Sequence, residues 1–190
     1  MELNALTALS PIDGRYAKQT DVLRNIFSEF AFMNARVRVE TEWLIALSEQ
    51  GFSELPEISA HGKAFLRGLA DNFSLSDCEA IKEIEKTTNH DVKAVEYWIK
   101  AQVDHDEELR KSAEFVHFAC TSEDINNTSH ALMLTEGRKA LVAELRKIHS
   151  KLVEQAHQWA DVSMLSRTHG QTASPTTVGK EFANVAVRLA

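Results

Sequence analysis

His169 stands in the stretch SRTHGQTASPTTVGKE, residues 166–181, among neutral polar side chains. An imidazole has an unperturbed pKa of about 6.5, so this histidine could exchange a proton with a bound ligand near neutral pH. Ser174 and Pro175 have the residue types of a helix N-cap and first position, which predicts a loop over 170–173 and a helix after it. Spacing alone favours an ordinary surface or structural histidine.

A second polar cluster lies in TTNHDVKAVEYW, residues 87–98. Thr88 and Asp91 have the spacing of a capping box, which places Asn89 and His90 in the first turn of a helix. The unpaired N–H groups of such a turn attract anions, and His90 could add a donor or a charge. Ordinary capping explains the same spacing.

The third cluster, ACTSEDINN at 119–127, repeats this pattern with Thr121 and Asp124, and Ser122 lies beside them. The hydroxyl groups could hold a carboxylate at the start of a long helix. A well-capped bundle helix without a ligand is again the plainer interpretation.

The fourth cluster is SPIDGRY, residues 10–16, in which Pro11 and Asp13-Gly14 predict a turn. Arg15 and Tyr16 follow that turn. Arginine on a loop suits two-pronged binding of a phosphate or carboxylate, although a lone exposed arginine usually has no ligand.

Metal and nucleophile chemistry have little support. His117 and Cys120 stand near Phe115 and Phe118 without a second ligand pair at a zinc spacing, which indicates the edge of a core. We expect no metal and no cofactor. A G-x-S-x-G motif, a P-loop and a dinucleotide fingerprint are all missing from the sequence.

Composition limits the class of protein. The 190 residues are 44% hydrophobic, with 7 glycines and 3 prolines, enough for an ordered globular core. A net charge of -7 argues against a nucleic-acid or anionic-membrane surface. No apolar run approaches the roughly 20 residues of a membrane span, and the first residues, MELNALTALSP, lack the features of a leader. We therefore expect a cytoplasmic protein with reduced Cys78 and Cys120.

The elements that must position these clusters are helical. Glycine and proline are missing between Gly14 and Gly51 and again between Gly68 and Gly137, which predicts an all-α chain. Apolar spacing predicts one long helix from about residue 23 up to Gly51, two helices within 62–86 with Ser76 as a cap, and a helix over 90–103.

From about residue 122 a very long helix is expected, with the apolar spacing of a bundle seam at Leu134, Leu141, Leu145, Ile148 and Leu152. The charged stretch VDHDEEL suggests a boundary near residue 111, giving an N-terminal helical domain over 1–111 and the start of a central bundle over 112–190. Helical spacing continues to Ala190 without a stop signal, so we expect a piece of a longer chain.

Taken together and in this order, the four clusters resemble the adenylosuccinate lyase family of the fumarase/aspartase superfamily, along essentially the whole sequence. The resemblance implies a superfamily-type helical fold and a β-elimination that releases fumarate from adenylosuccinate, giving AMP, and from the related succinyl-carboxamide ribotide of purine synthesis. It also implies a homotetramer whose active sites take residues from three subunits.

By the same resemblance His169 corresponds to the general acid, with His90 assisting near the leaving nitrogen. Arg15 and Tyr16 correspond to phosphate and ribose contacts, and Thr121 and Ser122 to the pocket for the succinyl carboxylate. Asn89, His90 and Asp91 correspond to a further substrate-binding segment.

Two departures from the family pattern stand out. Thr172 follows Gln171 where the family usually has proline. The serine-bearing loop that supplies the family's general base is not among residues 1–190, so we expect these residues alone to be inactive.

Two alternatives remain open at this stage. One is another superfamily lyase that releases fumarate from a different amine. The other is a noncatalytic helical module that oligomerises or binds a partner, for which the polar clusters are only caps.

Overall fold

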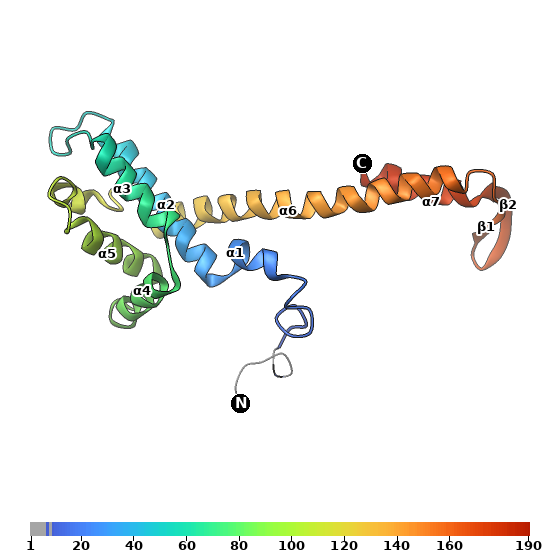
Figure 1. The fold of residues 1–190 in the computed structure, drawn as a ribbon, viewed down its shortest axis with the longest axis horizontal. Coiled ribbons are helices and arrows are strands. Elements are labelled where there is room, and N and C mark those ends of the chain that lie inside the picture. Colours follow the sequence, from blue (N-terminus) through green and yellow to red (C-terminus); the bar gives the residue numbers. More distant parts are fainter. Residues whose placement is uncertain (1–6, 8) are drawn as a thin grey trace. The chain divides into compact units, whose positions relative to one another are not determined.

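The computed structural model describes residue 7 and residues 9–190, and helices dominate this part of the chain (Figure 1). The expected helical class is confirmed, with one addition, a two-stranded sheet. The helices are α1 (Arg24–Phe27), α2 (Glu29–Ser48), α3 (Ala60–Asp71), α4 (Leu75–Thr88), α5 (Asp91–Val103), α6 (Ser122–Gln158) and α7 (Val178–Leu189), with 3-10 turns at Asp21–Leu23 and Leu109–Phe115 and strands β1 (Ser163–Thr168) and β2 (Gln171–Thr177).

The chain divides into two compact units, Met1–Gly137 and Arg138–Ala190, with the division inside α6. The domain boundary inferred from charge near residue 111 stays a prediction. Every helix within residues 7 and 9–190 is too short or too polar to span a bilayer. The expectation of no leader falls largely on residues 1–6 and 8, which lie outside the described residues.

The core of the first unit surrounds α2. Val37 and Leu44 of α2 are fully buried, as are Val95 and Ile99 of α5. Side chains of α3 and α4 complete the same cluster through Leu66 and Ile81. An apolar stripe at helical spacing therefore holds α2 at the centre, and α2 is the element against which the polar segments are placed.

The helix predicted from about residue 23 is interrupted at Ser28. Ser28 has an extended backbone, with ψ of 164°, and its hydroxyl accepts a hydrogen bond from the Ala31 N–H. A serine that caps a new helix thus divides the predicted one into α1 and α2, because a side-chain acceptor satisfies the free N–H of the first turn. The end before Gly51 is confirmed, since α2 stops at Ser48.

The two helices predicted within 62–86 and the helix predicted over 90–103 are confirmed as α3, α4 and α5. The expected cap is wrong. Ser74, not Ser76, is the N-cap of α4, and Ser74 and Asp77 form a reciprocal capping box.

In the second unit, the helix predicted to begin at Ser174-Pro175 is wrong. Both residues lie in β2, which pairs antiparallel with β1, and Pro175 is opposite Leu165. Proline is tolerated there because a two-stranded sheet consists of edge strands, where a missing N–H leaves no internal gap in a ladder. The helix instead begins at Val178 behind an N-cap at Thr177, whose hydroxyl accepts from the Lys180 N–H.

The long helix expected from residue 122 is confirmed as α6. Its predicted seam residues Leu134, Leu141, Leu145 and Ile148 are exposed in this chain. Gly137 lies on the same helix, where a Cβ atom would come within 2.2 Å of the Phe27 ring.

Candidate functional site

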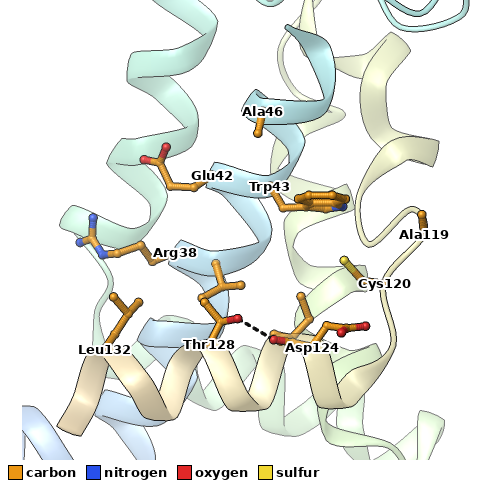
Figure 2. A pocket seen from close by; sticks show the side chains of 11 residues that line it. Arg38, Glu42, Trp43, Ala46, Ala119, Cys120, Asp124, Thr128 and Leu132 are labelled. Atoms are coloured by element: carbon orange, nitrogen blue, oxygen red, sulfur yellow. Dashed lines mark hydrogen bonds between the residues drawn. The ribbon is translucent and has the colours of Figure 1, made fainter. Parts of the chain in front are cut away.

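A cavity of about 600 Å³ lies beside α2 in the first unit, and it is not formed by the predicted site residues (Figure 2). Its walls include Trp43, Ala46, Cys120, Ile125 and Leu132. This lining is largely apolar, whereas the imidazole, hydroxyl and guanidinium groups singled out in the sequence lie outside it.

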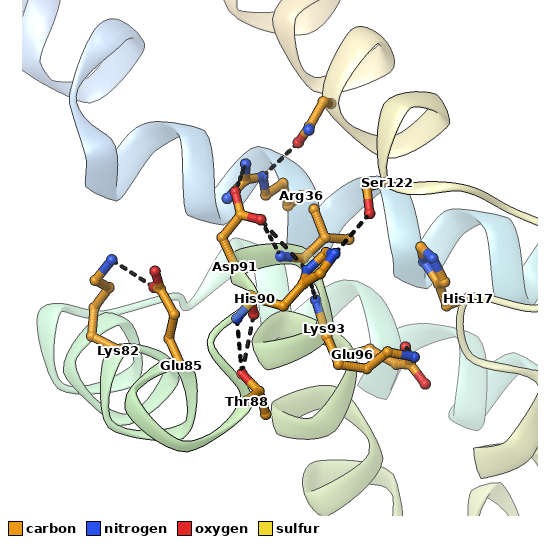
Figure 3. Close-up of polar contacts among 12 residues, drawn as sticks. Arg36, Lys82, Glu85, Thr88, His90, Asp91, Lys93, Glu96, His117 and Ser122 are labelled. Atoms are coloured by element: carbon orange, nitrogen blue, oxygen red, sulfur yellow. Dashed lines mark hydrogen bonds and ion pairs between the residues drawn. The ribbon is translucent and has the colours of Figure 1, made fainter.

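Arg36 of α2 joins two of the four polar clusters (Figure 3). Its Nη2 lies 2.5 Å from Oδ2 of Asp91 at the start of α5, and its Nε donates to Oδ1 of Asn126 in α6 at 2.9 Å. The Arg36 side chain is 4% exposed. Segments more than 30 residues apart in the sequence are therefore brought together around one buried guanidinium.

The capping box predicted from Thr88 and Asp91 is wrong. Thr88 ends α4, and Asn89 follows in the left-handed region with φ of 52°, a conformation that asparagine tolerates well. His90 is the N-cap of α5, and its Nδ1 accepts a hydrogen bond from the Lys93 N–H at 3.2 Å. Two successive helices thus meet at Asn89 and His90.

This capping bond defines what the other nitrogen of His90 can do. Because Nδ1 accepts, the neutral ring has its proton on Nε2, which lies 3.5 Å from Oγ of Ser122. The His90 side chain is 50% exposed. An accessible imidazole N–H therefore lies beside a serine hydroxyl. Two donors placed in this way can bind an anionic group.

Asp91 is engaged on both carboxylate oxygens. Oδ2 pairs with Arg36, and Oδ1 accepts from the Val92 N–H at 2.8 Å. Partial burial alone would raise the pKa of this carboxyl, but the Val92 N–H and the Arg36 charge outweigh it and hold the pKa below its ordinary value. Asp91 is consequently an anion that orients the turn, and its substrate contact stays a prediction.

Half of the capping box predicted at the start of α6 is present. The Thr121 N–H and hydroxyl both donate to Oδ2 of Asp124, at 2.7 and 2.9 Å, whereas the Asp124 N–H bonds to the Thr121 carbonyl. These bonds lower the pKa of the Asp124 carboxyl. The hydroxyl proton of Thr121 is thereby used, and Ser122 is the hydroxyl that lies next to His90.

The segment before α6 is fixed by contacts that the sequence did not indicate. His117 and Ala119 have positive φ angles of 65° and 61°. Nδ1 of His117 lies 2.6 Å from Oε1 of Glu40, and Trp43 Nε1 donates to the Phe118 carbonyl at 2.8 Å. The side chain of His117 is 15% exposed, consistent with the expected core edge. Burial raises the pKa of the Cys120 thiol.

Within the described residues, no group of three or more His, Cys, Asp or Glu side chains has the arrangement of a metal site. The turn predicted at SPIDGRY is confirmed, with hydrogen bonds from the Gly14 N–H to the Ser10 carbonyl and from the Tyr16 N–H to the Pro11 carbonyl. Arg15 and Tyr16 are exposed, and the Arg15 guanidinium lies 5.2 Å from the centre of the Tyr16 ring. Both side chains are therefore accessible to a ligand.

His169 belongs to the second unit and lies at the tip of the β1–β2 hairpin. Thr168 pairs with Gln171, so His169 and Gly170 form a two-residue turn, with φ angles of 48° and 75°. Positive φ at both positions matches the type I′ turns that suit hairpins. The predicted loop before a helix is therefore wrong, but the imidazole is exposed on a turn fixed by a strand pair.

A model of the family described as Lyase matches residues 14–190. The chain belongs to this lyase family. It is 53% identical over 191 residues to the adenylosuccinate lyase of Haemophilus influenzae and 49% identical to that of Escherichia coli K12. Each alignment covers 100% of this chain and 42% of the relative, so the chain spans less than half the length of these curated relatives.

Solved structures show the fold of this lyase-family chain. The 3-carboxy-cis,cis-muconate lactonizing enzyme of Pseudomonas putida matches with a TM-score of 0.70 and 22% identity, covering 89% of this chain and 37% of that one. The fumarate lyase of Mesorhizobium sp. BNC1 matches with a TM-score of 0.68 and 22% identity, covering 89% and 39%.

Proposed function

We propose that this chain is part of an adenylosuccinate lyase, which releases fumarate by β-elimination from adenylosuccinate, giving AMP, and from the related succinyl-carboxamide ribotide. The supporting relatives include adenylosuccinate lyases that are 53% and 49% identical over the whole chain. The structural observation behind the proposal is the approach of His90 Nε2 to Ser122 Oγ at 3.5 Å, which unites two polar segments.

In the proposed reaction, a base removes a proton from the carbon next to a carboxylate. The electron pair forms the new C=C bond as the C–N bond breaks, and the leaving nitrogen takes a proton. We assign that proton to His169, whose imidazole is exposed and therefore accessible to a substrate. His90 assists by donating from Nε2 near the leaving nitrogen.

The substrate's anionic groups have separate partners in this proposal. Ser122 and Thr121, where α6 begins, receive the succinyl carboxylate, because the helix dipole favours an anion there. Thr121 takes part by turning its donors from Asp124 to the substrate. Arg15 and Tyr16 receive the phosphate and ribose. Asn89 and Asp91 complete the segment around His90.

We further infer a cytoplasmic homotetramer of purine nucleotide biosynthesis, with active sites shared between subunits. The exposed apolar residues of α6 support association with further copies, because an uncovered apolar stripe of this length is unfavourable in water. We expect residues 1–190 alone to lack lyase activity, since the serine-bearing base loop of the family is not among them. Robust turnover by that polypeptide would contradict this expectation.

Fumarate release by the purified full-length protein tests the proposal. Adenylosuccinate, argininosuccinate and aspartate are offered in parallel, and we expect release from adenylosuccinate. Release only from a substrate without phosphate would support the alternative, another fumarate-releasing lyase, and would remove the role of Arg15. No release from any of the three would favour a noncatalytic helical module.

A further inference from the structure

We propose that Arg36 is a positioning residue of the proposed active site, whose guanidinium sets the separation between His90 and Ser122. The inference rests on the proposed function, and it adds a residue to which the sequence assigned no role. Arg36 does not touch the reacting groups. It acts through Asp91, which directly follows His90, and through Asn126, one helical turn after Ser122.

The burial of Arg36 is the first argument. The residue is 3% exposed, and its neighbours Met33 and Val37 on α2 are 2% and 0% exposed. Its partner Asp91 is 47% exposed, so only the guanidinium side of the ion pair is buried. The pair contributes little net stability, because desolvation of the buried charge offsets the attraction between the two charges. Stability alone therefore gives no reason for arginine at this position.

The geometry of the two guanidinium donors is the second argument. Nε bonds to Asn126 at 2.9 Å, and Nη2 bonds to Asp91 at 2.5 Å. These two donors belong to one rigid plane, so the start of α5 and the second turn of α6 are held at a fixed spacing. Lysine has a single ammonium on a flexible stem and cannot reproduce two donors at fixed angles.

The orientation of that plane is fixed by stacking. The Arg36 guanidinium carbon lies 3.9 Å from the centre of the Phe32 ring, one turn earlier on α2. The Phe32 ring stacks in turn on His130 of α6, with ring centres 4.5 Å apart and planes inclined by 14°. Four-residue spacing on α6 places Ser122, Asn126 and His130 on one face of the helix. This face contacts Phe32 through His130 and Arg36 through Asn126.

Variants of the full-length protein test the proposal. Arg36→Lys keeps the charge, and Arg36→Met keeps most of the volume. Arg38→Lys is the matched control, because Arg38 lies on the same helix and forms an exposed ion pair with Asp71 at 2.8 Å. Fumarate release from adenylosuccinate is measured over a range of substrate concentrations, together with the melting temperature.

We expect kcat to fall roughly 100-fold in both Arg36 variants with KM changed only a few-fold, as for a misplacement of about 1 Å in an active site. Arg38→Lys should match the parent. An unchanged kcat per folded Arg36→Lys molecule overturns the proposal. If Arg36→Met does not fold, Asn126→Ala replaces it, and an unchanged kcat in that variant also counts against Arg36.

Failure of the proposed function can be distinguished from failure of the Arg36 proposal. A parent protein that releases no fumarate from adenylosuccinate contradicts the function, and crystal structures of the parent and Arg36→Lys then decide the role of Arg36. The proposal requires the distance from His90 Nε2 to Ser122 Oγ to grow beyond 3.5 Å in the variant. The same distance in both proteins shows that Arg36 does not position them.

Discussion

Oε1 of Glu40 lies 2.6 Å from Nδ1 of His117, and the carboxyl group is completely buried. Glu40 is one turn after Arg36 on α2, so this helix contacts α6 through Arg36 and Asn126, and the segment before α6 through Glu40 and His117. Burial raises the pKa of Glu40, and the nearby Glu96 adds to the rise, whereas the contact with His117 opposes it. Within the described chain, Oε2 of Glu40 is buried without a hydrogen-bond partner.

Glu40→Gln should change the pH dependence of stability. Because the folded-state pKa of Glu40 is raised above its ordinary value of 4.5, the stability that this group contributes is fully present below pH 4.5 and is lost as pH rises through the folded pKa. The variant lacks that loss, so its free energy of unfolding relative to the parent should increase from pH 5 to pH 8. Urea unfolding at several pH values measures this difference.

Glu42→Gln is the control of opposite sign. The hydrogen bond from Arg67 lowers the pKa of Glu42, so its contribution is present above pH 4.5 and is lost as pH falls through the folded pKa. Its exposed ion pair contributes about 0.2–1 kcal/mol at most. If the two variants show the same pH trend, the assignment for Glu40 is wrong.

Gly179→Ala should destabilise the second unit. A Cβ atom at this position would lie 2.3 Å from the Ala156 carbonyl oxygen and 2.7 Å from the Ala160 Cα, both backbone atoms that cannot rotate away. We expect a loss of about 1–3 kcal/mol, the usual cost of overpacking. Gly68→Ala is the control, because its nearest neighbour would be 3.6 Å away, and alanine in a helix should add roughly 0.5–1 kcal/mol. A neutral Gly179→Ala would refute the close approach of α7 to the end of α6.

Ser74→Ala should weaken the start of α4. Ser74 accepts from the Asp77 N–H and closes a reciprocal box, and loss of such a cap costs about 1 kcal/mol. Ser76→Ala removes only a neighbouring hydroxyl, 2.8 Å from Ser74 Oγ, and should have the smaller effect. Thermal unfolding of the two variants compares them directly, and a larger loss from Ser76→Ala would restore the cap predicted from sequence.

His169→Asn tests the proposed general acid with little disturbance of the turn, because asparagine tolerates the positive φ of 48° at this position. In the full-length protein we expect kcat for fumarate release to fall by about 100- to 10,000-fold, the usual contribution of acid–base catalysis. His157→Asn, at an exposed position on α6, is the control and should retain the parent rate. Unchanged turnover in His169→Asn would remove the central assignment.

Helical periodicity predicted most of the fold, because long intervals without glycine or proline leave the apolar stripe as the dominant signal. The predicted break within 62–86 and the long α6 are examples. The hairpin was missed because Ser174-Pro175 suits a helix start as well as an edge strand. What decided between them was the pairing of Pro175 with Leu165, a contact that local spacing does not contain.

The site was predicted in part. The sequence identified His90, Ser122 and His169 as side chains that could do chemistry. It did not identify the residues that hold them in position. Arg36 and Glu40 have the four-residue spacing of an ordinary solvated pair on a helix surface. Their position on the buried stripe of α2, next to Met33 and Val37, was the available signal, since a charge on an apolar face needs a partner elsewhere in the fold.

Leu141, Leu145 and Ile148 of α6 have exposed fractions of 55%, 47% and 52%. If further copies cover them, folding and association are linked, because a partner that binds only the folded form stabilises it in proportion to how much partner is present. Dilution should then lower the melting temperature of this protein, so a stability value for it has meaning only together with the concentration at which it was measured.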